Sequence, residues 1–147
     1  MINQIINGKR EGLWERYHSN GQLRWRCNYK NDMLDGLYEE FHSNGQLNCR
    51  INYNNGKIEG LVESFHSNGE LKYRLNFKND KREGYCESFH SNGQLRYRCI
   101  YKNGKLEGLY EEYHSNGNIF KKSTFKNGLE FDQTIYKSNT GILNRNK

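Results

Sequence analysis

A segment of 24 residues repeats five times along this chain of 147 residues, with no insertion or deletion between copies. Its most regular part is an aromatic residue followed by His-Ser-Asn-Gly, and this motif begins at Tyr17, Phe41, Phe65, Phe89 and Tyr113. A short repeat of constant length predicts an array in which each unit packs only against its neighbours. The chain is therefore expected to be elongated, with one structural unit per repeat.

The composition favours short strands over helices. The chain contains 11 Tyr, 7 Phe and 15 Gly, and it has no Pro and no Ala; aromatic residues are enriched in strands, and Ala is the best helix former. Each repeat holds two aromatic-rich segments separated by two turns, which makes it a β-hairpin. Because only 33% of the residues are hydrophobic, a thick two-layer core is not expected. We predict an all-β fold, an elongated single-layer antiparallel β-meander of stacked hairpins.

The turn motif predicts the register of each hairpin. If Asn20-Gly21 forms a two-residue type I′ turn, in which both residues have positive φ, then Gly12 faces Tyr29 and Glu15 faces Arg26. The same rule pairs an acid with a base in the other four repeats: Glu39 with Arg50, Glu63 with Arg74, Glu87 with Arg98 and Glu111 with Lys122. Each pair contributes roughly 0.2–1 kcal/mol. The consistency of these pairs supports the predicted register.

The register also assigns side chains to the two faces of the sheet. Leu13 and Tyr17 are predicted on one face, and Trp14, Leu23 and Trp25 on the other. The four cysteines occupy apolar columns of the repeat, without the spacing of a zinc site: Cys27, Cys49, Cys86 and Cys99. They are expected to be small apolar fillers with free thiols, although Cys86 and Cys99 face each other and a disulfide between them is geometrically conceivable.

We place the repeat array at residues 1–128. It starts with a half repeat at residues 1–11, and five repeats follow from Gly12. After Phe125 the pattern decays, so residues 129–147 are predicted to form a degenerate C-terminal cap with a basic tail. Terminal units that differ from the internal ones are typical of repeat arrays.

The order Gly-x-Trp/Tyr-x-x-Tyr/Phe, then Asn-Gly, then Tyr-Lys-Asn-Gly-Lys-x-x-Gly resembles MORN repeats. The similarity covers about residues 5–130 and is greatest to the variant found in bacterial YwqK-like proteins, which are often described as antitoxins of toxin–antitoxin pairs. This resemblance implies an elongated single-layer β-meander that serves as a binding surface. MORN arrays are associated with protein scaffolding, with dimerisation and, less securely, with phospholipid contact, so the resemblance implies no single partner.

All five histidines lie in the repeated motif, and each is followed by Ser. A His-Ser pair suggests a nucleophile with its base, and five histidines suggest a metal site. Equivalent side chains lie two strands apart, roughly 9.6 Å, which is too far for two imidazoles to share a metal with bonds of about 2.0–2.1 Å. Catalysis needs different groups in one pocket, whereas each repeat offers the same groups. We therefore expect a frame element, no catalytic or metal-binding residues, no cofactor and no enzyme activity.

We predict a protein–protein interaction module or scaffold, with recognition by the variable positions of the repeat. One version, by resemblance, is neutralisation of a toxin or effector protein, and another is pairing of two copies through the sheet edges. The variable positions form two columns. The first contains Arg16, Glu40, Ser64, Ser88 and Glu112, and the second contains Arg24, Asn48, Lys72, Arg96 and Phe120.

The alternative is a basic surface that binds anionic phospholipid or nucleic acid. The chain has a formal net charge of +6, and lysines cluster at the second turn of each repeat: Lys30, Lys57, Lys78, Lys81, Lys102, Lys105 and Lys126. These residues are predicted along one edge of the sheet, where solvated turn lysines are also common. The N-terminal residues lack the charged segment and the apolar stretch typical of a signal peptide, and no run of 18 apolar residues occurs, so we expect a cytoplasmic protein.

Overall fold

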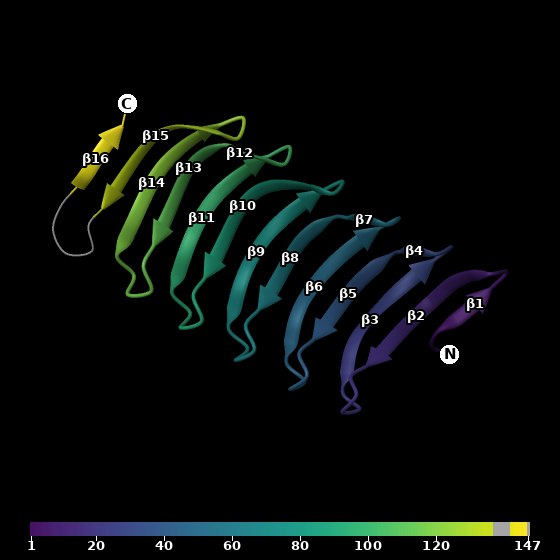
Figure 1. Ribbon diagram of the computed structural model, residues 1–147. Coiled ribbons are helices and arrows are strands. Elements are labelled where there is room, and N and C mark those ends of the chain that lie inside the picture. The colour runs from purple at the N-terminus through teal and green to yellow at the C-terminus, as the bar shows by residue number, and fades with distance from the viewer. Residues whose placement is uncertain (137–141, 147) are drawn as a thin grey trace.

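The computed structural model describes residues 1–136 and the backbone of residues 142–146. The fold is all-β, and the strands stack side by side in chain order as one curved antiparallel layer (Figure 1). No helix occurs in the described residues. The predicted single-layer meander is confirmed. The strands are β1 (Gln4–Ile6), β2 (Lys9–Tyr17), β3 (Leu23–Lys30), β4 (Met33–Leu34), β5 (Gly36–Phe41), β6 (Leu47–Asn54), β7 (Lys57–Ile58), β8 (Gly60–Phe65), β9 (Leu71–Lys78), β10 (Lys81–Phe89), β11 (Leu95–Lys102), β12 (Lys105–Leu106), β13 (Gly108–Tyr113), β14 (Ile119–Lys126), β15 (Leu129–Tyr136) and β16 (Ile142–Asn146).

The turns form two rows, one at each end of the strands (Figure 1). The His-Ser-Asn-Gly turns form one row, which we call the histidine edge. The Asn-Gly and Asn-Asp turns form the other, which we call the lysine edge. At the end of the array β15 pairs with β14 and with β16, so strands continue into the predicted cap. Residues 137–141 and 147 of that predicted cap lie outside the described residues.

The turns of the lysine edge are type I′. Both central residues have positive φ, for example 47° at Asn55 and 77° at Gly56. Two copies have Asp at the second position, and Asp32 and Asp80 adopt φ of 66° and 63° in place of Gly. A left-handed conformation costs a non-Gly residue about 1–2 kcal/mol, less for Asp than for most others, so these two turns need a compensating contact.

The predicted type I′ turn at Asn20-Gly21 is wrong. Asn20 is not among the residues with positive φ, whereas Gly21 has φ of 84°. The amide of Gly21 donates to the carbonyl of His18 at 3.0 Å, and the amide of His18 donates to the carbonyl of Gln22 at 2.8 Å. The loop therefore has three residues, a type I turn closed by a left-handed Gly, and the other four repeats bond in the same way.

A β-bulge follows each three-residue loop. Arg16 faces Trp25 and Tyr17 faces Leu23, so Arg24 has no partner of its own on β2. Facing residues in a ladder lie on the same side of the sheet, which places Leu23 with Tyr17. The prediction that Leu23 shares a face with Trp14 is therefore wrong, because the bulge changes the alternation of β3 at this point.

Beyond the bulge the predicted register is confirmed. Gly12 faces Tyr29, and the equivalent Gly faces an aromatic residue in every repeat. Gly12 has φ of 70°, a conformation that L side chains rarely adopt. The five predicted acid–base pairs also face each other, beginning with Glu15 and Arg26.

The buried apolar residues lie on one face of the sheet, which we call the aromatic face. Its central cluster consists of Val62, Leu75, Cys86 and Cys99, surrounded by half-buried side chains that include Tyr73. Cys86 faces Cys99 as predicted, and both thiols are free, as are those of Cys27 and Cys49. A one-layer sheet buries apolar groups here only because large rings from neighbouring strands cover them, so the core is thin.

Candidate functional site

The histidine edge is a row of contacts between consecutive repeats. Nε2 of His18 lies 2.9 Å from the carbonyl oxygen of Phe41, and Nδ2 of Asn20 donates to the carbonyl of Ser43 at 2.8 Å. The same two bonds join each of the next three repeats to its successor. Nε2 must carry a proton to donate to a carbonyl. These four histidines therefore join consecutive repeats, as expected of a frame element.

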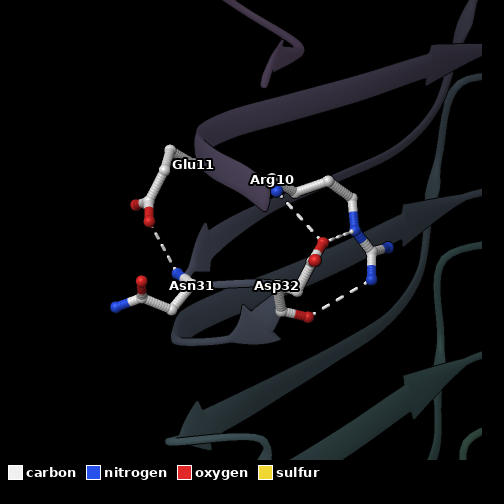
Figure 2. Close-up of polar contacts among 4 residues, drawn as sticks. All are labelled: Arg10, Glu11, Asn31 and Asp32. Atoms are coloured by element: carbon white, nitrogen blue, oxygen red, sulfur yellow. Dashed lines mark hydrogen bonds and ion pairs between the residues drawn. The ribbon is translucent and has the colours of Figure 1, made fainter. Parts of the chain in front are cut away.

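Acidic residues perform the equivalent task at the lysine edge. The carboxylate of Glu11 accepts the amide of Asn31 at 2.8 Å (Figure 2). The acid before Gly bonds the next turn in the same way in all later repeats: Asp35, Glu59, Glu83 and Glu107. These carboxylates are engaged with turn amides, so this acidic column is a structural cap.

The turn at Asp32 has the compensating contact that its backbone conformation requires. Oδ1 of Asp32 accepts the amide of Arg10 at 3.0 Å and Nε of Arg10 at 2.8 Å, and the guanidinium also reaches the carbonyl of Asp32 (Figure 2). The bond from Arg10 lowers the pKa of the Asp32 carboxyl group. At the second such turn, Oδ1 of Asp80 accepts the amide of Ile58 at 2.7 Å. Asp thus replaces Gly where it can bond the preceding repeat.

Opposite the aromatic face, acids and bases alternate from strand to strand across the sheet. The ion pairs themselves form mainly between hairpins, not within them. Nε of Arg26 contacts Oε2 of Glu39 at 2.6 Å, although Arg26 also faces Glu15. Arg50 with Glu63, Arg74 with Glu87 and Arg98 with Glu111 repeat this choice. The predicted registry of charges is confirmed, but most of these bonds hold consecutive hairpins together. We call this side of the sheet the ladder face.

Glu111 is the most enclosed acid of the ladder face, with a side chain only 4% exposed. Burial raises its pKa, but hydrogen bonds from Arg98, Lys122 and Tyr113 outweigh this and lower the pKa below the usual value of a Glu. Lys122 provides the within-hairpin pair that the sequence predicted, at 3.1 Å. The carboxylate is thus held charged by three donors.

An apolar column runs beside the ion pairs on the ladder face. It consists of Leu13, Leu37, Leu61, Tyr85 and Leu109. Leu61 is 45% exposed and Tyr85 is 74% exposed, the largest exposure in this column. Apolar side chains at one-repeat intervals, roughly 9.6 Å, give the face a regular series of contact points.

Tyr85 stands between two shallow hollows. One has a volume of about 340 Å³ and is lined by Arg98, Ile100 and Leu109 as well as Tyr85. The other has a volume of about 390 Å³ and is lined by Leu61, Arg74 and Tyr85 among others. The arginine side chains are about half exposed, at 50% and 53%. Exposed Tyr with flanking Arg and apolar walls is the composition that dominates binding energy at protein interfaces.

The first column of candidate partner-binding residues lies on the aromatic face, because it alternates with the ladder acids along the strand. Arg16 is exposed, whereas Glu40 and Glu112 are half-buried and Ser64 and Ser88 are buried. The hydroxyl of Ser88 donates to the carbonyl of Lys72 at 3.1 Å. The two serines are therefore not exposed to a partner in this structure.

The second candidate column forms the β-bulges. It contains Arg24, Asn48, Lys72, Arg96 and Phe120, one in each repeat. Arg24, Lys72 and Arg96 are exposed, and the ring of Phe120 packs edge-on against His114 at 5.1 Å between centroids. A bulge turns its side chain out of the regular alternation. Because each bulge follows a three-residue loop, this column lies close to the histidine edge.

The Tyr85 site was not among the predicted partner-binding residues. The sequence does contain its signal, because Tyr85 is the only aromatic residue in a column whose other members are leucines. The repeated leucine by itself does not indicate a binding column, because a buried position also repeats as leucine. Only the exposure of its side chain in the folded sheet separates Tyr85 from a core position.

The lysine edge carries the remaining concentration of charge. All seven predicted lysines are exposed, and within the described residues none of them forms an ion pair. Lys78 faces Lys81, and Lys102 faces Lys105, so like charges adjoin at two turns. The described part of the chain has no helix that could span a membrane.

The fold and its surfaces define a repeat protein in which a frame of identical contacts carries variable exposed residues. The family model described as MORN repeat variant matches the chain five times, at residues 10–31, 34–55, 58–79, 82–103 and 106–127. These matches cover more than half of the chain, and each starts 24 residues after the last. The chain belongs to the MORN repeat variant family. MORN repeats are generally associated with binding of proteins or membrane lipids. No curated protein shows significant similarity to the chain.

Proposed function

We propose that the chain is a non-enzymatic protein-interaction module and that its partner binds the ladder face around Tyr85. The observation that carries this proposal is an exposed tyrosine between two hollows, flanked by half-exposed Arg74 and Arg98. Tyr and Arg are enriched among the residues that dominate binding energy. The ion pairs with Glu87 and Glu111 hold both arginines in place, which reduces the entropy lost on binding.

Neutralisation of a cytoplasmic toxin or effector is one specific form of this function, suggested by the resemblance to YwqK-like proteins. The ladder face offers a protein partner both apolar and charged contacts, because the leucine column and the ion pairs run side by side along the array. Isolation of the partner from the native cell tests this form of the proposal.

The test compares two triple variants in affinity capture from the native cell. Leu37→Asp, Leu61→Asp and Leu109→Asp together place charge on the ladder face. Lys57→Glu, Lys81→Glu and Lys105→Glu together reverse charge on the lysine edge. All six residues are exposed, so circular dichroism should show both variants folded. We expect a partner captured by the wild type to be lost with the leucine variant and retained with the lysine variant.

The opposite pattern would contradict the ladder-face proposal and support a second candidate function. In that function, the exposed lysine edge binds anionic phospholipid or nucleic acid. It is favoured by two pairs of facing lysines and by the absence of ion pairs to these lysines among the described residues. Binding to anionic vesicles or to duplex DNA would then fall steeply between about 50 and 200 mM salt, and the lysine variant would abolish it.

A further inference from the structure

The ladder face is complementary to itself, and we propose that it binds a second copy of this chain, face to face about a two-fold axis. This inference rests on the proposed function, because it uses the same face and names its partner. It differs from pairing through the sheet edges, which the exposed outer strands alone would suggest. Two alternations that the register imposes on the face make it complementary to itself.

The first alternation is one of charge. From β2 to β14, the acids and bases of the ladder face alternate strand by strand, beginning with Glu15, Arg26 and Glu39. A two-fold axis parallel to the strands, between β8 and β9, reverses this order in the second copy. It places Arg50 of one copy opposite Glu87 of the other, and Glu63 opposite Arg74. Every position of the series then faces the opposite charge.

The second alternation is one of size. Each Leu or Tyr of the apolar column faces a smaller residue within its hairpin: Leu13 faces Asn28, Leu37 faces Asn52, Leu61 faces Asn76, Tyr85 faces Ile100 and Leu109 faces Thr124. The same two-fold axis places Tyr85 of one copy over Asn52 of the other. Leu61 lies over Asn76. At four of the five contacts a large side chain therefore meets a smaller polar one, as in packed β-sheets. At the fifth contact Leu37 meets Ile100, and both are apolar.

The other face-to-face arrangement does not have this complementarity. A two-fold axis parallel to the array, at right angles to the strands, places each strand over the same strand of the second copy. With this axis over the row of charges, Glu87 would face Glu87 and Arg74 would face Arg74, which costs affinity. With the axis between the charges and the apolar column, each charge would face the apolar column and have no partner of opposite charge. The axis parallel to the strands is therefore the one that the charges select.

The arginines are able to make the additional contacts. Arg50, Arg74 and Arg98 use Nε for the ion pair with the next strand, and about half of each side chain remains exposed. A guanidinium carries five N–H donors, so its terminal nitrogens are free to meet a carboxylate of the second copy. Glu87 is the most suitable acceptor, because its side chain is 30% exposed.

The area of the face is sufficient for a reversible dimer. Ten strands at about 4.8 Å spacing give a length of roughly 48 Å, and the two rows of side chains are about 13 Å wide. Each copy would cover roughly 600 Å², so the total of about 1,200 Å² lies at the lower limit for specific interfaces. We therefore expect a dimer with a micromolar Kd, which is populated at tens of micromolar protein.

Mixing two charge-reversed chains tests the register of this dimer. Arg50→Glu alone places two carboxylates opposite each other at the Glu87 contact, and Glu87→Arg alone places two guanidinium groups opposite each other at the Arg50 contact. Each variant by itself should therefore be monomeric in sedimentation velocity at about 50 µM, where the wild type should dimerise. A 1:1 mixture restores every opposite pair in a heterodimer, and the dimer should reappear.

The control mixes Arg50→Glu with Glu63→Arg. These two residues form an ion pair within one chain, at 2.5 Å, but they do not face each other across the proposed axis. This mixture should stay monomeric, and a dimer here would overturn the register. A monomeric wild type would overturn the proposal of self-association, while the proposed function stands if the leucine variant still loses a different captured partner.

A second measurement covers the case in which charge reversal disturbs folding. Asn52→Cys and Tyr85→Cys change two exposed residues, and a bismaleimide that spans the roughly 10 Å between packed sheets should cross-link the two chains when they are mixed. Wild-type chain treated with the same reagent is the control for the native cysteines. Absence of the cross-link in the mixture would contradict the proposed interface.

Discussion

Replacing Leu75 by Ala is expected to lower the free energy of unfolding by about 2–4 kcal/mol, because Leu→Ala changes in a core leave a cavity that collapses only partly. Leu75 lies in the buried cluster with Val62, Cys86 and Cys99. In a single-layer sheet no second layer can move in to fill the cavity. Urea unfolding followed by circular dichroism measures the change.

Leu61→Ala is the matched control for Leu75→Ala. Both leucines lie in the central hairpin formed by β8 and β9, but Leu61 is 45% exposed on the ladder face. Its truncation should change the free energy of unfolding by less than about 1 kcal/mol. Equal losses in the two variants would show that the aromatic face is not the core.

Replacing Arg98 by Met should destabilise the chain by about 2 kcal/mol at pH 7. The substitution removes one of three donors to the Glu111 carboxylate, which is almost completely buried. Removing one partner of a fully buried ion pair costs about 3–5 kcal/mol, and the lower value here allows for the half-exposed arginine. Arg74→Met is the control, because its partner Glu87 is more exposed, and it should cost less than about 1 kcal/mol.

The effect of Arg98→Met should depend on pH in one direction. In the wild type the pKa of Glu111 is lowered, so its stabilising contribution is present above the unfolded pKa of about 4.3. That contribution is lost as the pH falls through the folded pKa. Once Glu111 is protonated in both proteins, the buried charge is gone. Unfolding free energies measured from pH 7 to pH 3 should therefore converge, and a constant difference would argue against this role of Glu111.

The register of the hairpins was predictable from the sequence although the turn was not. Asn20-Gly21 was expected to form a two-residue loop, and the real loop has three residues, Ser19 to Gly21. The bulge at Arg24 adds one residue to β3 and cancels the shift. Glu15 therefore faces Arg26 with either turn, so the acid–base pairs do not distinguish the two turns. Asn-Gly is compatible with both turns, and local residues alone did not distinguish them.

The sequence also does not predict which of two acids each ladder arginine pairs with. Arg26 faces an acid on each neighbouring strand, Glu15 and Glu39. The spacing of neighbouring strands is the same on both sides, so it does not favour either acid. The structure selects Glu39, whereas Glu15 accepts the hydroxyl of Tyr17 at 2.5 Å. The repeat predicts only the register within a hairpin, so it predicts only the pairs within a hairpin. The contacts of the histidine edge depend in the same way on how successive hairpins stack.

The distinction between frame and variable positions decides where a partner is sought. The histidines, the turn asparagines and the acids before Gly each bond the next repeat, so their repetition reflects stacking. The contacts between repeats do not explain Tyr85, because its side chain is exposed and takes no part in the frame. A binding function should therefore be most sensitive at Tyr85 and its neighbours.

Site-specific photo-crosslinking in the native cell tests the ladder-face proposal most directly. A benzophenone side chain would be placed in turn at Tyr85 on the ladder face, at Asn20 on the histidine edge and at Lys102 on the lysine edge, all exposed positions. We predict a cross-linked protein adduct from position 85 alone, with a second copy of the chain or with another protein. Adducts from position 20 or 102 with none from position 85 would contradict the proposed binding face.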